Sequence, residues 1–197
     1  MCPEAIVRSP SRNSQVKNGL AVVKLGQYRR FGEFRVFNRR ILTHNGAMSP
    51  RLSIRTGPEP TSVLYRSRAS APFGADDLHD LSVQAAKTNT QNDITGYLSF
   101  RENFFTQYFE GSGDAVNDLY ERIVTDTRHI IEVAVVLDVD HRRFPDWSMR
   151  LIDPLWHPTA NAIDAIDDLL HTSQDSATDR EIVGALKVLV DQVNKNG

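Results

Sequence analysis

A glutamine in the stretch FFTQYFEG, which runs from Phe104 to Gly111, stands where a strand pattern calls for an apolar side chain. Side chains of a strand point alternately to two faces, so Gln107 shares a face with Phe105 and Phe109. A buried amide without a hydrogen-bond partner costs about 1–3 kcal/mol. We therefore expect a polar group opposite Gln107.

Tyr65 and Asn89 are polar residues in similarly apolar settings. Tyr65 shares one face of the predicted strand SVLYRSR with Val63 and Ser67, and Asn89 ends the apolar stripe of a predicted helix. A phenol and an amide are natural partners, because the phenol both donates and accepts a hydrogen bond. Taken alone, a buried Tyr–Gln pair is usually an ordinary core contact, and an asparagine at a helix end is usually a C-cap.

Arg128 and His129 follow a second predicted helix in the stretch DTRHI. An arginine there ordinarily interacts with the helix C-terminus, and a histidine there is ordinarily a surface residue. The sequence contains no GxSxG, HExxH, P-loop or CxxC motif, and its six histidines are scattered. A hydrolase or a metal enzyme therefore has no support, and the chemistry to expect is hydrogen bonding.

The elements that must position these residues follow the order strand, helix, strand, strand, helix and strand, with one further strand. The strands fall at 62–68, 94–100, 104–111, 130–140 and 147–152, and helices follow the predicted N-caps Asp76 and Asp114. This order predicts an α+β fold with a ferredoxin-like βαββαβ sheet, an added fifth strand and two helices on one face. The first and third strands are then neighbours, so Tyr65 and Gln107 meet on the helix-facing side.

The predicted faces of the other elements follow from the same periodicities. Two helical patterns, at 160–172 and 179–193, either cover the second face of the sheet or mediate association. The strand at 130–140 places its apolar residues on one face: Ile131, Val133, Val135, Leu137 and Val139. The last strand places three apolar residues on one face: Trp147, Met149 and Leu151.

The composition is that of a soluble globular protein, with 40% hydrophobic and 24% charged residues in a chain of 197. This length suits one domain with additional segments. Cys2 is the only cysteine, and no apolar run approaches the roughly 20 residues needed to cross a bilayer. We therefore expect a cytoplasmic protein without disulfides.

Charge divides the chain into two unlike parts. Residues 1–60 hold 11 Lys and Arg against 3 Asp and Glu, whereas the remainder holds 12 against 22, which makes nucleic-acid binding by that remainder unexpected. Three interpretations of the basic part compete. It is an arm that binds nucleic acid or an acidic surface, an organelle presequence, or a disordered extension with Met48 as an alternative start. We favour the extension and divide the chain into 1–60, 61–153 and 154–197.

Four stretches in succession resemble the motifs of the BLUF family, which are blue-light sensors that use flavin. They are VLYRSRAS, NTQNDITGYLSF, FFTQYFEGSGDAVNDLYERIVTDTRH and RRFPDWSM. The resemblance runs from about Ser62 to Ile152, and these motifs have little other reason to occur together in this order. It implies a short photoreceptor with one sensor domain, in which FAD is held non-covalently with its isoalloxazine ring between the two helices.

The resemblance also implies roles for single residues. Tyr65 and Gln107 match the photoactive pair of the family, and Trp147 and Met149 match the residues that relay the change to a partner surface. The flavin-contacting positions fall on Tyr65, Ser67, Asn89, Gln107, Arg128 and His129.

The mechanism of the family implies that excited flavin takes an electron and a proton from Tyr65, and that the pair recombines after the Gln107 amide has rearranged. A new hydrogen bond to the flavin then shifts its absorption to longer wavelength, so the chain is a photoswitch and not an enzyme. Two residues depart from the family pattern: Thr88 stands where many members have Asn or His, and Arg150 where a glycine is frequent.

The resemblance further implies a homo-oligomer and a downstream signalling protein that the sequence does not name. The alternative to a photoreceptor is a flavin-free ferredoxin-like module for protein interaction or dimerisation. Yellow protein whose spectrum shifts reversibly under blue light supports the first, and colourless protein that takes up no FAD supports the second.

Overall fold

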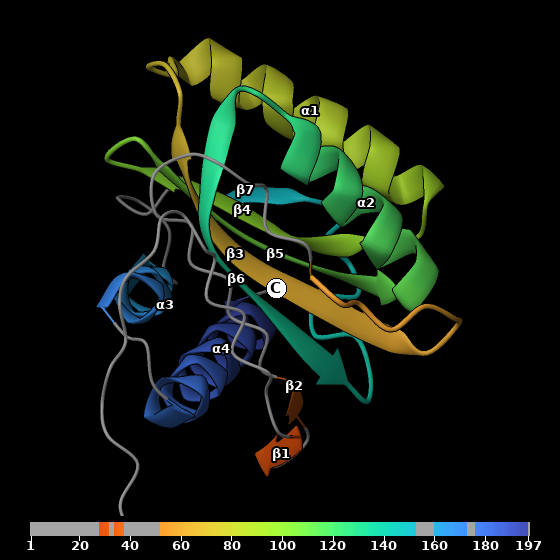
Figure 1. Ribbon diagram of the computed structural model, residues 1–197. Coiled ribbons are helices and arrows are strands. Elements are labelled where there is room, and N and C mark those ends of the chain that lie inside the picture. The colour runs from red at the N-terminus through yellow and green to blue at the C-terminus, as the bar shows by residue number, and fades with distance from the viewer. Residues whose placement is uncertain (1–27, 32–33, 38–51, 153–159, 173–175, 197) are drawn as a thin grey trace, which may run out of the picture.

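The computed structural model describes residues 28–31, 34–37, 52–152, 160–172 and 176–196. Their strands form one sheet in the order β1-β2-β6-β3-β5-β4-β7, and all neighbours are antiparallel except β4 and β7. Helices α1 and α2 cover one face of this sheet, and α3 and α4 cover the other (Figure 1). The elements are β1 (Tyr28–Phe31), β2 (Phe34–Phe37), β3 (Pro60–Ala69), α1 (Ala75–Gln91), β4 (Thr95–Arg101), β5 (Phe104–Ser112), α2 (Gly113–Thr125), β6 (His129–Val139), β7 (Arg150–Ile152), α3 (Ala160–Thr172) and α4 (Ser176–Asn196).

The predicted α+β order and its ferredoxin-like arrangement are confirmed. Strand β3 pairs with both β5 and β6, and its register with β5 sets Tyr65 directly opposite Gln107. A tight turn joins β4 to β5, with left-handed backbone at Glu102 (φ 50°) and Asn103 (φ 72°). Two left-handed residues match the right-handed twist of the strands, which holds this hairpin in register.

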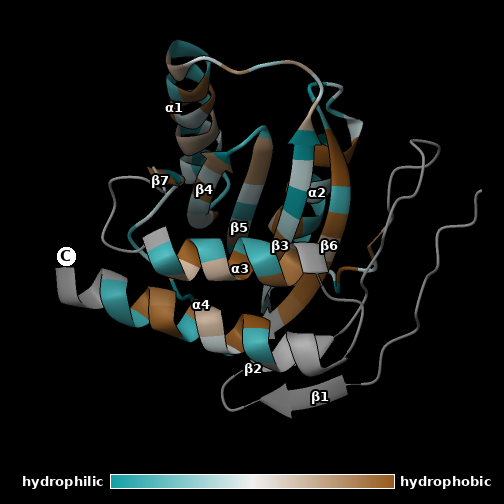
Figure 2. Ribbon diagram, turned by 90° about the vertical axis from the view of Figure 1, so that its left-hand side faces the viewer, coloured by the Kyte–Doolittle hydropathy of each residue, from teal (hydrophilic) through white to brown (hydrophobic). Residues whose placement is uncertain are grey.

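Strand alternation divides the side chains of β3 and β5 between two cores. Tyr65, Phe105 and Phe109 belong to the core beneath α1 and α2, whereas Leu64 and Tyr108 belong to the core beneath α3 and α4. The C-terminal helices therefore cover the second face of the sheet, which is one of their two predicted roles. Figure 2 shows α3 and α4 lying next to each other across that face.

A bulge in β6 corrects the prediction that five of its apolar residues share a face. Arg66 pairs with Val133 and Ser67 pairs with Ile131, so Glu132 is an extra residue in β6. An extra residue reverses the alternation. As a result Ile131 packs beneath α1 and α2, whereas Val133 and the later residues of the set pack beneath α3 and α4.

Both predicted N-caps are wrong by a few residues. Helix α1 begins after Gly74, whose N–H donates to the carboxylate of Asp77 at 2.9 Å, so Asp76 lies in the first turn. Helix α2 begins after Ser112, whose hydroxyl accepts from the backbone N–H of Ala115 at 3.3 Å. Asp114 instead accepts from the N–H of Gly57 at 2.9 Å and so ties the preceding loop to α2.

Part of the predicted N-terminal extension has regular structure. Strands β1 and β2 form a hairpin that pairs with the outer edge of β6, and Leu52 and Ile54 are buried in the core beneath α1 and α2. The apolar residues at this end of the core were not anticipated from the sequence. Cys2 and Met48 lie outside the described residues, as do positions 153–159 between the last strand and α3.

Polar contacts as well as apolar ones hold α3 to the sheet. The Asp167 carboxylate accepts from Arg66 Nε at 2.9 Å and from the Thr106 hydroxyl at 2.6 Å. Arg66 also pairs with Glu132 at 2.5 Å, and its guanidinium lies 3.6 Å from the centre of the Phe104 ring. This buried arginine therefore has a partner on each side.

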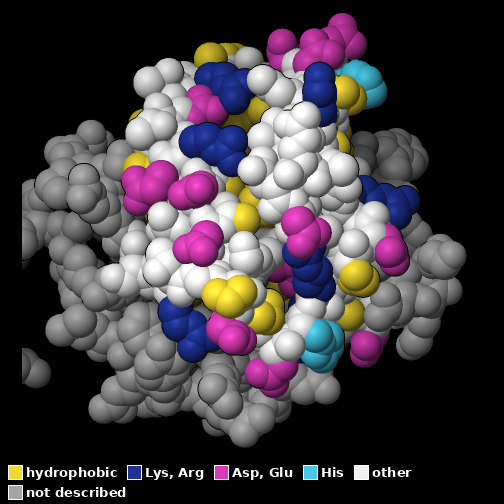
Figure 3. Space-filling model, turned by 90° about the vertical axis from the view of Figure 1, so that its right-hand side faces the viewer, with side chains coloured by type: hydrophobic (Ala, Val, Ile, Leu, Met, Phe, Trp, Pro, Cys, Tyr) yellow, Lys and Arg dark blue, Asp and Glu magenta, His cyan; other side chains and the backbone are white. Residues whose placement is uncertain are grey.

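The surface carries charges of both signs. On the side of the molecule seen in Figure 3, the described Lys and Arg side chains are interspersed with Asp and Glu rather than gathered by sign. No helix in the described part of the chain is both long enough and apolar enough to cross a bilayer.

Candidate functional site

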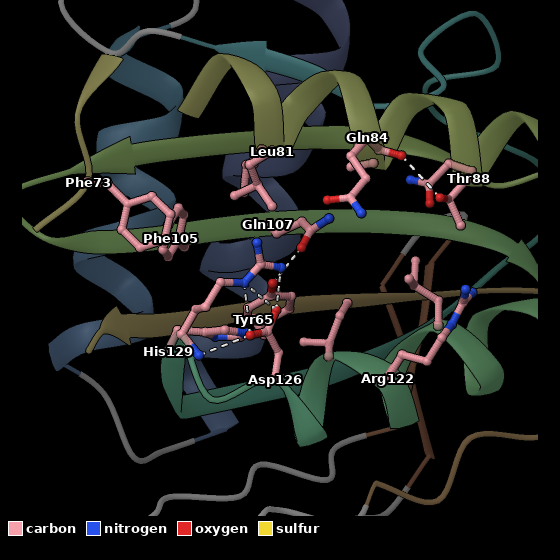
Figure 4. A pocket seen from close by; sticks show the side chains of 16 residues that line it. Tyr65, Phe73, Leu81, Gln84, Thr88, Phe105, Gln107, Arg122, Asp126 and His129 are labelled. Atoms are coloured by element: carbon pink, nitrogen blue, oxygen red, sulfur yellow. Dashed lines mark hydrogen bonds and ion pairs between the residues drawn. The ribbon is translucent and has the colours of Figure 1, made fainter. Parts of the chain in front are cut away.

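A cavity of about 260 Å³ lies between α1 and α2, above the strands β3 and β5 (Figure 4). Its volume is slightly below the range of about 300–1,000 Å³ that is usual for ligand pockets. The sequence-predicted residues that line it come from five different elements or loops: Tyr65, Asn89, Gln107, Arg128 and His129. Ser67 is buried on the same strand as Tyr65, but it does not line the cavity.

Tyr65 and Gln107 form a hydrogen-bonded pair on the floor of this cavity. The Tyr65 hydroxyl donates to Gln107 Oε1 at 2.5 Å, and both side chains are buried, with 4% and 7% of their surface exposed. Burial raises the pKa of Tyr65 far above its ordinary value, and the nearby Asp126 carboxylate raises it further. Tyr65 is therefore a neutral phenol that holds its proton toward the amide, which is the polar partner that the sequence predicted for Gln107.

The other end of the Gln107 amide faces Met149. Gln107 Nε2 donates to the Met149 sulfur at 3.3 Å. A thioether accepts hydrogen bonds but cannot donate one, whereas a tyrosine hydroxyl does both. These two partners together favour one amide orientation, with oxygen toward Tyr65 and nitrogen toward Met149. Turning the amide over sets its oxygen against the sulfur and breaks that contact.

Two polar atoms at the cavity make no hydrogen bond within the described part of the chain. They are Asn89 Nδ2, on a side chain with 2% of its surface exposed, and His129 Nδ1. A buried polar atom without a partner costs about 1–3 kcal/mol, so both atoms are expected to be matched by a polar ligand. Asn89 is thus an inward amide that lines the cavity, and it lies in the last turn of α1.

His129 is neutral near pH 7 and lies beside Tyr65. Burial lowers the pKa of His129, and the nearby Arg128 guanidinium lowers it further, while the Asp126 carboxylate acts in the opposite direction. Its ring stacks on that of Tyr65 with the centres 6.0 Å apart. A neutral imidazole has one nitrogen that donates and one that accepts, so His129 can serve either kind of ligand atom.

Arg128 is held at the cavity rim by Asp126, which is the C-cap of α2. The guanidinium donates from Nε at 3.0 Å to both carboxylate oxygens and from its terminal nitrogen at 2.6 Å. Hydrogen bonds from Arg128 lower the pKa of Asp126, so the carboxylate stays ionised. The pair fixes the loop that carries His129 into β6.

Several lining residues were not among the predicted site residues, although Thr88 was noted as a departure from the family pattern. Gln84 and Thr88 face the cavity from α1, and the Thr88 hydroxyl donates to the Gln84 backbone carbonyl at 3.1 Å. Arg122 and Ile123 face it from α2. Gln84 lies three positions after Leu81 and Thr88 three positions after Ala85, two residues of the predicted apolar stripe, so the helical period contained the signal for them.

The structure separates the two residues that were predicted to share a face of the last strand. That strand is shorter than predicted and begins at Arg150, and the segment before it turns Trp147 and Met149 to opposite sides of the sheet. Trp147 packs beneath α3 and α4, with its ring 5.4 Å from that of Phe144 and 4.7 Å from the Arg150 guanidinium. Only Met149 of the two contacts Gln107.

Comparison with known proteins agrees with this geometry. A family model described as "Sensors of blue-light using FAD" (BLUF) matches residues 61–150. The solved dark-state structure of BlrB, a BLUF protein, has a TM-score of 0.54 and 27% identity over 68% of this chain and 96% of that one.

Two curated relatives are much longer than the part they share with this chain. The blue light- and temperature-regulated antirepressor BluF of Escherichia coli (strain K12) is 30% identical over 109 residues, which are 55% of this chain and 27% of the relative. Photoactivated adenylate cyclase subunit beta of Euglena longa is 32% identical over 102 residues, 51% of this chain and 12% of the relative. The cavity lies within the region that the family model matches, residues 61–150.

Proposed function

Residues 61–150 of the chain belong to the BLUF family of blue-light sensors that use flavin, and we propose that the chain is a photoreceptor that binds FAD and signals through Tyr65 and Gln107. The observation that carries this proposal is the hydrogen bond from Tyr65 to Gln107 at the floor of a cavity with unmatched polar atoms. The proposed FAD follows the description of the family, and its binding is non-covalent.

The residues around the cavity fit a flavin ring. Such a ring is planar and aromatic, with carbonyl oxygens and ring nitrogens along one edge. Asn89 Nδ2 supplies a donor, and His129 Nδ1 supplies a donor or an acceptor, for groups of that edge. Leu81, Ala85 and Ile123 supply apolar contacts for the ring faces from the two helices. Arg128 is proposed to contact the flavin at the rim of the cavity. Ser67 is proposed to contribute to flavin binding from its position behind Tyr65.

The proposed switch depends on the two partners of the Gln107 amide. A bound flavin supplies the absorption of blue light and an excited state that accepts an electron. Tyr65 holds a proton on its hydroxyl; with flavin bound, it would give that proton and an electron to the flavin and take both back on recombination. While the proton is away, the Tyr65 oxygen could accept a hydrogen bond. Gln107 then turns its nitrogen toward Tyr65 and gives up its bond to the Met149 sulfur. The two orientations of the buried amide have different hydrogen-bond partners, which favours two discrete states over a continuum.

Output is proposed to pass from Met149 to another protein. The chain has no assigned catalytic chemistry, and the names of its relatives, an antirepressor and cyclase subunits, describe proteins of which it spans a small share. We propose a sensor that acts on an unidentified partner, as a homo-oligomer and in the cytoplasm. Trp147 is kept as a second relay residue on the opposite side of the sheet.

Absorption spectroscopy of the purified full chain tests this function. We expect yellow protein with a flavin spectrum that moves to longer wavelength under blue light and returns in the dark. Chromatography of the released cofactor is expected to identify FAD rather than FMN or riboflavin. Colourless protein that takes up no added FAD would contradict the proposal and favour a flavin-free interaction module.

Two substitutions test the roles of the pair. Gln107→Leu and Tyr65→Phe are expected to retain the flavin and to lose the normal spectral shift, because the first removes the amide and the second the hydroxyl. Thr88→Val, which lies at the cavity but not on the pair, is the matched control and is expected to keep the shift. Normal photocycling in both Gln107→Leu and Tyr65→Phe would refute the assignment.

A further inference from the structure

Glu110 is a fully buried carboxylate whose place in the fold the switch does not explain. It lies on β5 three residues after Gln107, and its side chain points to the opposite face of the sheet, with none of its surface exposed. Its Oε1 accepts from the backbone N–H groups of Arg143 at 2.7 Å and of Phe144 at 2.6 Å. Its Oε2 accepts from the Tyr108 hydroxyl at 2.8 Å.

An ionisable group is rarely buried without hydrogen-bond partners, because the charged form loses its hydration. Burial raises the pKa of Glu110 above its ordinary value, and the hydrogen bonds from Phe144, Tyr108 and Arg143 offset part of that rise. The two N–H groups and the Tyr108 hydroxyl all donate to the carboxyl oxygens, an arrangement that suits the ionised form, and hydrogen bonds to an ionised acceptor are roughly twice as strong as neutral ones. On this geometry Glu110 holds the two backbone N–H groups firmly in place.

Those N–H groups begin the segment that brings Met149 to Gln107. The Phe144 carbonyl accepts from the Trp147 N–H at 3.1 Å, and the Trp147 carbonyl accepts from the Gly96 N–H at 2.6 Å. Two residues further on, the Met149 sulfur accepts from Gln107. Strand β5 thus holds this segment at both ends, through Glu110 on one face of the sheet and through Gln107 on the other.

We propose that Glu110 is a positioning residue of the light response, whose carboxylate fixes the backbone at 143–144 so that Met149 stays within hydrogen-bond reach of Gln107. This inference rests on the proposed switch, because Met149 is one of the two partners of the moving amide. Glu110 touches neither the amide nor the cavity, and it acts only through the segment that ends at Met149.

The position of Met149 is measured first, without light or flavin. The chain contains three methionines, so labelled methyl groups give a simple NMR spectrum. Glu110→Gln keeps the size of the side chain but removes its charge, and we expect it to move the Met149 methyl signal and leave the signals of Met1 and Met48 in place. Tyr108→Phe is the matched control, because it removes a hydrogen bond from the same carboxylate without touching the 143–144 backbone. An unmoved Met149 signal in Glu110→Gln, or an equal movement in Tyr108→Phe, overturns the proposal.

Thermal recovery after illumination measures the consequence for the switch. Glu110→Gln is expected to slow the return to the dark spectrum by about fivefold, which corresponds to about 1 kcal/mol. In a Met149→Leu background the same substitution is expected to have no further effect, because the contact through which Glu110 acts is gone. Effects that add in the double variant overturn the proposal.

A second variant covers a failure of Glu110→Gln to fold. Glu110→Asp keeps the charge but shortens the side chain by one methylene, so it withdraws the carboxylate from the 143–144 backbone. Glu110→Asp is expected to move the Met149 signal, and to leave the rate of thermal recovery unchanged in the Met149→Leu background. Effects of the two substitutions on that rate that add in the double variant overturn the proposal here as well. If Glu110→Asp moves the Met149 signal but the unsubstituted chain shows no photoresponse, the proposed function is refuted and the positioning role of Glu110 is left intact.

Discussion

Asp167→Asn should destabilise the protein more than a neighbouring substitution on the same helix. Asp167 accepts hydrogen bonds from Arg66 and Thr106, and the Arg66 side chain has 5% of its surface exposed. Removing one partner of a buried ion pair costs about 3–5 kcal/mol when the remaining charge is left alone. Arg66 keeps Glu132 as a partner, and the carbonyl of the new amide can still accept one of the two bonds. We therefore expect a loss of about 1–2 kcal/mol in the free energy of unfolding.

Asp164→Asn is the matched control, one turn earlier on α3. Asp164 pairs with Arg101 at 2.6 Å, but the two side chains have 34% and 47% of their surface exposed. An exposed pair contributes little to stability and is screened by salt, because the screening length falls to about 3 Å at 1 M ionic strength. The two substitutions remove the same charge from the same helix and differ in the burial of the partner.

Urea unfolding of both variants, at low and high salt, measures the difference. The expected result is a larger loss for Asp167→Asn that persists in high salt, and a smaller loss for Asp164→Asn that disappears there. The flavin spectrum of the dark state should be unchanged in both, because neither residue lies at the cavity. An equal loss in the two variants, or a loss for Asp167→Asn that salt abolishes, would show that burial of Arg66 does not strengthen this contact.

Two further predictions use other features of the fold. Because burial lowers the pKa of His129 below its ordinary value of 6.5, the unfolded chain binds more protons than the folded chain between the two values. The free energy of unfolding should thus fall as the pH is lowered through about 6.5, and a His129→Gln variant that shows the same pH slope in its thermal melts would contradict this. Gly96→Ala should cost more than about 2 kcal/mol, since its φ is 154° and a Cβ there would lie 2.1 Å from the Tyr108 carbonyl oxygen. Gly184→Ala in α4 meets no atom within 4 Å and should stabilise the protein by about 0.5–1 kcal/mol, so equal effects in urea unfolding would refute the steric argument.

The contact between Tyr65 and Gln107 and the inward position of Asn89 could be predicted from the sequence, because these residues stand at regular positions. Gln107 lies between two phenylalanines in a strand of period two, and Asn89 lies at helical spacing from Leu81 and Ala85. The order of the elements then makes β3 and β5 neighbours, which sets Tyr65 against Gln107. Each step uses a period or a connection rule, and neither depends on the details of packing.

The parts that could not be predicted depend on single irregular residues. The bulge at Glu132 reverses the faces of β6, and nothing in the alternation of IIEVAVVLDVD marks it. Trp147 and Met149 were assigned to one face because a strand was extended over them, whereas the segment there is irregular and held by Glu110 and Gly96. A buried carboxylate that binds backbone N–H groups has no period, so only the folded structure brings it together with its donors.

The register between β3 and β5 ties the two layers of the molecule to the same backbone. Tyr65 pairs with Gln107 and points toward α1 and α2, while the adjacent pair, Arg66 and Thr106, points to the other face and binds Asp167 of α3. Successive residues of a strand share one stiff backbone, because their peptide units are planar and their hydrogen bonds fix them in the sheet. A change in the backbone beneath the Tyr65–Gln107 pair therefore cannot be confined to the cavity, because the next residue on each strand carries a contact to α3. The layer of C-terminal helices is held to the sheet at the place where the two residues of the proposed switch meet.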